Sequence, residues 1–89
     1  MGIEWSLAKA QSNLKKHGVS FEEAATVFDD RLTEYLPDLA HPIEEERFIA
    51  FGTSDKGHLL AVIFTEIGET VRIISAREMT PKEKRQYER

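Results

Sequence analysis

The chain has 89 residues, of which 40% are apolar and 31% are charged, and its formal net charge is −4. This composition is typical of a globular protein, and the length suits a single domain over residues 1–89. Because cysteine is absent, disulfides and thiolate metal sites are excluded. No apolar run approaches a membrane span and no signal pattern begins the chain, so we expect a cytoplasmic protein without membrane contact.

A first helix is predicted directly after Ser6, which can cap its N-terminus. The positions with the i, i+3, i+7 spacing of a buried helix face are Leu7, Ala10 and Leu14. Basic residues at positions 15–17 complement the helix dipole in the last turn, and Gly18 supplies the left-handed stop. We expect Trp5, just before this helix, to belong to the core.

A second helix is predicted to follow at once, because Ser20 and Glu23 have the spacing of a capping box. Its expected buried stripe consists of Phe21, Ala24, Ala25 and Phe28. Asp29 and Asp30 suit a turn, so we expect the helix to end there.

From Leu32 onwards the apolar residues alternate with polar ones, which predicts strands instead of helices. Four strands are expected, spanning Leu32–Leu36, Arg47–Phe51, Leu59–Thr65 and Thr70–Ala76. Pro37 ends the first strand and Gly52 closes the second. Strands that follow one another in this way favour an antiparallel meander.

A last helix is predicted to start at Thr80, which can act as its N-cap. Pro81 suits the first helical position, and Glu83 completes a second capping box. Two N-terminal helices, a four-stranded antiparallel meander and a C-terminal helix predict an α+β fold with helices on one face of the sheet.

Motifs for a metal or a nucleotide are missing from the sequence. His17, His41 and His58 lie far apart and no His-x-x-x-His pair occurs, so we expect neither a metal site nor a cofactor. The five glycines are isolated from one another, which argues against a Gly-rich phosphate loop. No Gly-x-Ser-x-Gly nucleophile elbow is present either.

Charge is segregated along the chain. Residues 71–89 carry six Lys or Arg against three Asp or Glu, whereas residues 20–50 carry nine acidic residues against two basic ones. A local basic surface can steer a phosphate-bearing ligand even to an acidic protein. The basic set, with the end of the first helix included, comprises Lys15, Lys16, His17, Arg72, Arg77, Lys82, Lys84 and Arg85.

Arg72 and Arg77 are the main candidates for chemistry. A planar guanidinium holds two phosphate oxygens at once, so it can fix a phosphodiester and stabilise the charge that develops during cleavage without a metal. The alternative is that Arg72 is merely exposed and that Arg77 pairs with the acidic middle segment. Because the two are five residues apart, they share a face only if a bulge or the strand end re-aims one of them.

The candidates for acid–base chemistry each have a plain structural alternative. His17 could act as a general acid or base, or could simply complement the helix dipole. Glu46 and Arg47 could be a catalytic carboxylate and its positioning arginine, or an ordinary exposed pair. Tyr87 could stack on a base or pack against the helix.

Several stretches of the chain resemble the BrnT family of bacterial toxins. They are Ile3-Glu4-Trp5, the block Lys15 to Ala24, Val27 to Asp30, Glu46-Arg47, the block Arg72 to Arg77, and Glu83 to Tyr87. The resemblance covers nearly the whole chain, and its two longest blocks, K-H-G-V-S-F-E-E-A and R-I-I-S-A-R, are specific together.

This resemblance implies a RelE-like fold and a type II toxin that cleaves RNA without a metal and thereby inhibits translation. It also implies neutralisation by a BrnA-type antitoxin, usually in a heterotetramer of two toxins and two antitoxins. The ribbon-helix-helix dimer of the antitoxin would bind promoter DNA. RNA, free or on the ribosome, would be cut by attack of its 2′-hydroxyl on the adjacent phosphorus, which leaves a cyclic phosphate.

Carried over position by position, the resemblance makes Arg72 and Arg77 the residues that clamp the phosphate and stabilise the transition state. Acid–base or positioning roles fall in the same way to Lys16, His17, Glu46 and Tyr87. From their charge we expect substrate contacts at Lys16, Arg47, Lys82 and Arg85, of which Lys82 and Arg85 steer RNA or contact a partner. The net acidity predicts weak, strongly salt-dependent binding of free RNA. A competing hypothesis is a catalytically silent partner that binds an antitoxin and modulates transcription of its own operon.

Overall fold

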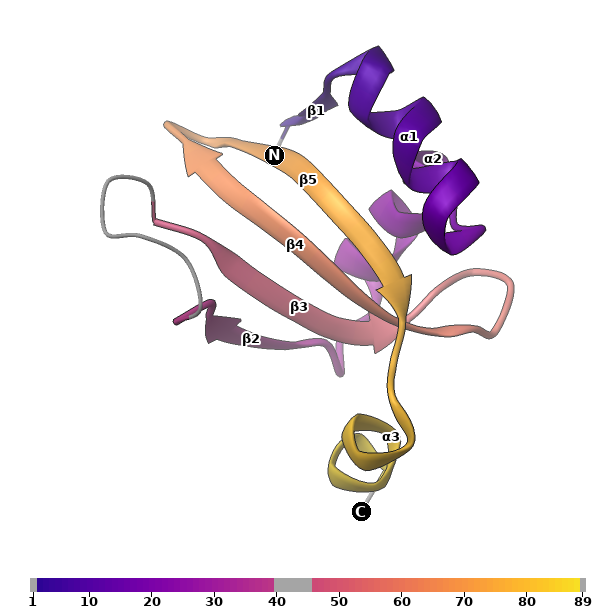
Figure 1. The fold of residues 1–89 in the computed structure, drawn as a ribbon. Helices are drawn as coiled ribbons and strands as arrows, with labels where there is room; N and C mark the ends of the chain where they lie inside the picture. Colours follow the sequence, from indigo (N-terminus) through magenta and orange to yellow (C-terminus); the bar gives the residue numbers. More distant parts are fainter. Residues whose placement is uncertain (1, 40–45, 89) are drawn as a thin grey trace.

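The computed structural model describes residues 2–39 and 46–88. Its elements are β1 (Gly2–Trp5), α1 (Leu7–His17), α2 (Phe21–Ala25), the 3-10 helix η1 (Thr26–Asp29), β2 (Glu34–Pro37), β3 (Phe48–Thr53), β4 (Leu59–Ile67), β5 (Thr70–Glu78) and α3 (Pro81–Tyr87). The strands form one sheet in the order β1-β5-β4-β3-β2. Figure 1 shows α2 and the segment after it behind this sheet, α1 beside β5, and α3 beyond the end of β5.

The sheet contains the predicted meander and one strand more. β2, β3, β4 and β5 pair antiparallel in chain order, as expected, and the α+β class is confirmed. The expectation of a purely antiparallel, four-stranded sheet was wrong, because β1 pairs parallel with β5. Ile3 and Trp5 do alternate with Gly2 and Glu4, but a pattern of four residues is too short to stand out.

Gly52 lies inside β3 and does not close it, contrary to the sequence prediction. A Cβ atom at this position would lie 2.3 Å from Oγ1 of Thr33 and 2.8 Å from Cγ1 of Val27. The glycine therefore allows η1 and the loop after it to pack closely on β3. The prediction mistook a site of close approach for a strand end.

The ends of α1 agree with the sequence, but of its three expected core residues only Ala10 packs against the core. Ser6 caps the helix and Gly18, with φ of 70°, ends it. The expected core residues Leu7 and Leu14 are 72% and 52% exposed, and the buried residue is Asn13. The reason is that α1 lies along the edge of β5, where Asn13 meets the backbone polar groups of Ala76.

The second helix is shorter than predicted, since α2 ends at Ala25 and the chain continues as η1. Oγ of Ser20 accepts a hydrogen bond from the backbone N–H of Glu23 at 3.0 Å. The expected capping box is only half formed, because the carboxylate of Glu23 bonds to Ser54 and His58 instead.

The core lies between the sheet and the layer of α2 and η1. Its largest fully buried side chains are Phe21, Val27, Leu60, Val62 and Ile73. Trp5 packs against this core, with its ring 6.0 Å from that of Phe21 in an edge-to-face arrangement, as the sequence predicted. The sheet face that carries Leu60, Val62 and Ile73 is called the core face below, and the opposite one the outer face.

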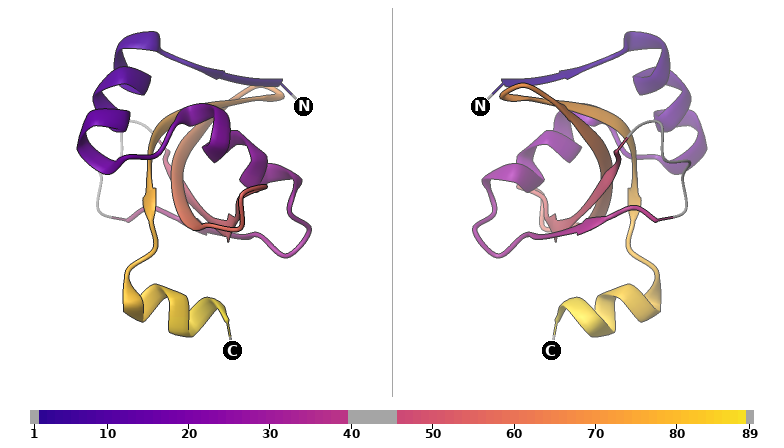
Figure 2. Two further views of the ribbon diagram at one scale, coloured as in Figure 1. Left: turned by 90° about the vertical axis from the view of Figure 1, so that its right-hand side faces the viewer. Right: turned by 90° about the vertical axis from the view of Figure 1, so that its left-hand side faces the viewer.

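The C-terminal helix α3 forms as the sequence predicted. The Oγ1 atom of Thr80 accepts from the N–H of Glu83 at 3.2 Å, and the Glu83 carboxylate accepts from the N–H of Thr80 at 2.9 Å. Pro81 occupies the first turn. Figure 2 shows α3 on the far side of the sheet from α1 and α2, so the expectation that the helices share one face was wrong. None of the residues of α3 is buried. No helix in the described part of the chain has the length and apolar character to cross a membrane.

Candidate active site

The pairing of β4 with β5 is interrupted once, at Ile74. Ile63 pairs with Ser75 and Phe64 with Ile73, so Ile74 has no partner on β4. One extra residue on a strand is a β-bulge, and bulges often re-aim side chains beside functional sites. The bulge shifts the alternation of side chains along β5 by one residue.

This shift places Arg72 and Arg77 on the same face of the sheet. Their partners on β4, Thr65 and Ala61, are four residues apart on a regular strand and therefore face the same way. That face is the outer one, and Ser75 lies on it between the two arginines. From the sequence, the two arginines could share a face only if a bulge or the strand end re-aimed one of them. The bulge at Ile74 does this.

Both guanidinium groups are held by carboxylates. Nη1 of Arg72 lies 2.5 Å from Oε2 of Glu4, its neighbour on β1. Nη1 and Nη2 of Arg77 donate to the two carboxylate oxygens of Glu83 on α3, at 2.7 and 3.1 Å. These hydrogen bonds raise the pKa of Arg77 and lower that of Glu83. The hydrogen-bonded partner of Arg77 is thus Glu83 on α3, and the negative charge of Asp38, from the acidic middle segment that the alternative named, also raises the pKa of Arg77.

A groove of about 150 Å³ runs between α1 and the bulge of β5. We call it the basic groove, and it is lined by Lys9, Ser12, Asn13, Lys16, His17, Ile74 and Ser75. Two residues predicted for the site, Lys16 and His17, therefore lie beside the arginine-bearing strand. Lys9, Ser12 and Ser75 were not predicted, although the spacing of Lys9, Ser12 and Lys16 places them on one helix face.

Three predicted site residues lie on α3. Lys82 and Arg85 are exposed, and the hydroxyl of Tyr87 donates to Oδ2 of Asp30 at 3.1 Å. Burial and the nearby carboxylate of Asp30 raise the pKa of Tyr87. In this arrangement Tyr87 connects the end of α3 to the residue that follows η1.

Glu46 and Arg47 lie just before β3, toward the Arg72 end of the sheet. The carbonyl of Glu46 accepts from Oγ1 of Thr65 at 2.8 Å, and Thr65 is the ladder partner of Arg72. His17 and α3 belong to the Arg77 end. The predicted residues therefore divide between the two ends of β5 and do not form one cluster.

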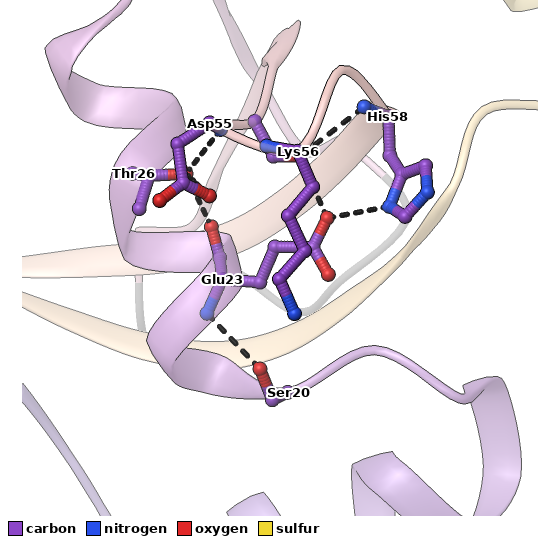
Figure 3. Close-up of polar contacts among 7 residues, drawn as sticks. Ser20, Glu23, Thr26, Asp55, Lys56 and His58 are labelled. Carbon is purple, nitrogen blue, oxygen red and sulfur yellow. Dashed lines mark hydrogen bonds and ion pairs between the residues drawn. The ribbon is translucent and has the colours of Figure 1, made fainter.

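One polar cluster escaped prediction from the sequence, and Figure 3 shows it at the β3–β4 loop. The Glu23 side chain, 8% exposed, accepts from Oγ of Ser54 at 2.6 Å and lies 2.7 Å from Nδ1 of His58. Burial raises the pKa of Glu23. The hydrogen bonds from Ser54 and His58 and the positive charge of Lys56 lower it by more, so the pKa lies below its ordinary value. Because Glu23 and His58 are 35 residues apart, no local spacing pattern could reveal the pair.

The cluster ties α2 to the loop between β3 and β4. Oγ1 of Thr26 adds to it by accepting from the backbone N–H of Asp55 at 2.9 Å. Within residues 2–39 and 46–88, no three His, Cys, Asp or Glu side chains are arranged to hold a metal ion.

Comparison with known proteins identifies the family. The model of the ribonuclease toxin BrnT, of type II toxin–antitoxin systems, matches residues 5–83. The chain belongs to the BrnT family. Its substrate class is therefore RNA and its partner is a cognate antitoxin. The match includes β5 with both arginines and ends at Glu83, so Tyr87 lies outside it.

The solved structures include a relative of this BrnT-family chain. It is similar to the 1.1 Å crystal structure of the Brucella abortus ribonuclease toxin BrnT, with a TM-score of 0.68 and 28% sequence identity. The similarity covers 90% of this chain and 97% of that one. A comparison with curated proteins gave no match.

Proposed function

We propose that this BrnT-family toxin is a metal-independent endoribonuclease with a RelE-like fold, and that it inhibits translation by cleaving RNA in the cytoplasm. The family provides the ribonuclease activity in general terms. The single observation that carries the mechanism is the presence of Arg72 and Arg77 on one face of the sheet. Two cationic forks that face the same way suit one phosphodiester backbone.

The carboxylates bound to the arginines occupy the place of phosphate oxygens. A guanidinium binds carboxylate and phosphate in the same bidentate geometry, so RNA competes with Glu4 at Arg72 and with Glu83 at Arg77. During cleavage the 2′-oxygen forms a bond to phosphorus while the bond to the 5′-oxygen breaks. The products are a 2′,3′-cyclic phosphate and a 5′-hydroxyl, and the arginines stabilise the charge on the non-bridging oxygens.

His17 is the best-placed group for proton transfer. It lies in the basic groove beside Ser75, two strand positions from Arg77 on the same face. A histidine there could take the proton from the 2′-hydroxyl or return one to the 5′-oxygen. Tyr87 and Glu46, at opposite ends of the site, are the alternatives for these roles.

The remaining basic residues fit roles in substrate binding. Lys16 accompanies His17 in the basic groove, and Arg47 lies toward the Arg72 end. Lys82 and Arg85 lie on the exposed surface of α3, where they can steer a polyanion.

The proposed partner is a BrnA-type antitoxin with a ribbon-helix-helix fold, in a complex of two toxins and two antitoxins. Promoter DNA is then bound through the antitoxin alone. We also propose that residues 1–89 form one toxin domain, since the sheet pairs β1 with β5 from opposite ends of the chain.

Arg77→Ala should lower kcat/KM for RNA cleavage about 10²–10³-fold, the usual cost of removing one transition-state donor. Arg77→Lys should restore little, because an ammonium lacks the fork. Cleavage by the wild type should persist in EDTA. The matched control is Arg31→Ala, which removes an exposed arginine from the turn after η1. Heteronuclear NMR spectra check that each variant is folded.

The proposal fails if wild-type protein, freed of antitoxin, leaves both naked RNA and translating ribosomes intact at low salt. Growth experiments address the silent-partner hypothesis. An endoribonuclease arrests growth without antitoxin, and the Arg72→Ala/Arg77→Ala variant does not. If cells that express the wild type and cells that express the double variant grow equally well without antitoxin, a silent partner that acts on transcription is supported.

A further inference from the structure

We propose that the basic groove between α1 and β5 binds a backbone phosphate of single-stranded RNA, next to the scissile phosphate at Arg77. The inference rests on the proposed ribonuclease function and adds a second phosphate site to it. It assigns substrate contacts to Lys9 and Ser75, in addition to Lys16.

The charge of the groove contrasts with that of the whole protein. Its lining includes Lys9, Lys16 and His17 and has no acidic residue. The hollow beside α3 is lined by Glu34 and Glu83, and the hollow beside η1 by several aspartates, Asp29, Asp30 and Asp55. On a chain with a net charge of −4, a hollow whose charged residues are all cations favours an anion.

The groove also offers a hydroxyl donor. Ser75 is half-buried, and its hydroxyl makes no side-chain hydrogen bond within the part of the chain that the structure describes. The neighbouring bulge at Ile74 places this hydroxyl on the outer face. Serine hydroxyls and lysine ammonium groups are ordinary donors to phosphate oxygens.

The groove and Arg77 are in register with each other. Ser75 and Arg77 are two residues apart on the same face of β5, a separation of about 6.6 Å along a strand. The position of α1 is fixed, because the side chain of Asn13 bonds to both backbone groups of Ala76. Phosphates in the groove and at Arg77 therefore belong to neighbouring nucleotides of one strand.

The test measures binding apart from cleavage. A fluorescent single-stranded oligodeoxynucleotide has the phosphates but lacks the attacking 2′-hydroxyl, so its anisotropy reports binding alone. Lys9→Ala/Lys16→Ala should weaken binding about tenfold and reduce the slope of log K against log salt by about 0.7 for each phosphate that the variant no longer neutralises. Ser75→Ala should weaken binding about fivefold, as expected when one hydrogen bond is removed.

The matched control is Lys15→Ala/Lys56→Ala, which removes the same charge from exposed positions outside the groove. Equal weakening by the two double variants overturns the inference, because net charge alone would then explain binding. Absence of wild-type binding at low salt overturns it as well. If wild type and groove variants cleave RNA equally, the proposed phosphate site in the groove is overturned while the proposed ribonuclease function is supported. If binding depends on the groove residues but no RNA is cleaved, the phosphate site in the groove is supported and the proposed ribonuclease function is overturned.

Discussion

Asn13 takes the place beside β5 that a longer first strand would occupy. Its side chain donates to the carbonyls of Val19 and Ala76 at 2.9 and 2.8 Å, and accepts from the N–H of Ala76 at 3.0 Å. A strand edge presents backbone groups that need partners, and a primary amide provides both a donor and an acceptor. Sequence reasoning placed Leu7 and Leu14 inside because it assumed that α1 packs on an apolar face.

Asn13→Ala should destabilise the fold by about 2–4 kcal/mol, because it leaves one N–H and two carbonyls without these partners in a buried place. Urea unfolding measures the change. The neighbouring variant Ser12→Ala is the control and should stay within about 0.5 kcal/mol of wild type. Similar urea concentrations at the unfolding midpoint of the two variants would contradict this, because water would then replace the amide of Asn13 without loss of stability.

At the scale of elements, α3 is attached to the sheet by polar contacts and not by a buried face. It has no buried residue, and its contacts include Arg77 with Glu83 and Tyr87 with Asp30. Elements held in this way open locally, with a free energy below that of global unfolding.

Glu83→Gln should accelerate amide exchange in α3 about fivefold, which corresponds to about 1 kcal/mol of local stability. The variant weakens both the capping box and the ion pair with Arg77. Hydrogen exchange of the sheet amides should remain unchanged. Glu88→Gln removes the same charge from the C-terminal end of α3 and serves as the control. Because a carboxylate there opposes the helix dipole, this variant should not accelerate exchange, and an equal acceleration would mean that the contacts of Glu83 are not the cause.

Local signals in the sequence predicted what depends on neighbouring residues. The caps of α1 and α3 and the stop at Gly18 are of this kind, because each forms within a few residues. Non-local features were missed. The role of β1 depends on β5, and the bulge at Ile74 is visible only against the regular ladder of β4, since Ile-Ile-Ser reads as ordinary strand.

The candidate site shows the same division. Residue type alone selected Arg72 and Arg77, but only the bulge decides that they share a face. Lys16 and His17 were selected as candidates because of their charge, whereas Ser75 and Lys9 join them in the basic groove through the packing of α1 against β5. The Glu23–His58 contact required the fold itself.

At the scale of the whole molecule, stability should depend on several carboxylates that are better stabilised in the folded state than in the unfolded one. The N–H groups of Thr53 and Leu32 lower the pKa of Asp30. The hydrogen bond from Arg77 lowers the pKa of Glu83, and the pKa of Glu23 also lies below its ordinary value of 4.5. A lowered folded pKa contributes stability above the unfolded pKa, and this contribution is lost as pH falls through the folded pKa.

The melting temperature should therefore be steady from neutral pH down to about pH 5 and fall progressively below it. Scanning calorimetry or circular dichroism between pH 7 and pH 3 measures this. Glu23→Gln should flatten the acid transition, while Glu22→Gln, at an exposed position of the same helix, should not. A wild-type melting temperature that is constant down to pH 3 would contradict the stabilising role of these carboxylates.

The parallel pairing of β1 with β5 has a consequence for the order of synthesis. The ion pair between Glu4 and Arg72 joins residues 68 positions apart, and α1 meets Ala76 across a similar separation. Contacts this distant in sequence form late, because almost the whole chain must be closed into a loop. On the ribosome, β1 and α1 lack their partner strand until β5 has emerged from the exit tunnel. The arginine-bearing face is thus assembled only after β5 has been synthesised, together with the neighbours that hold it.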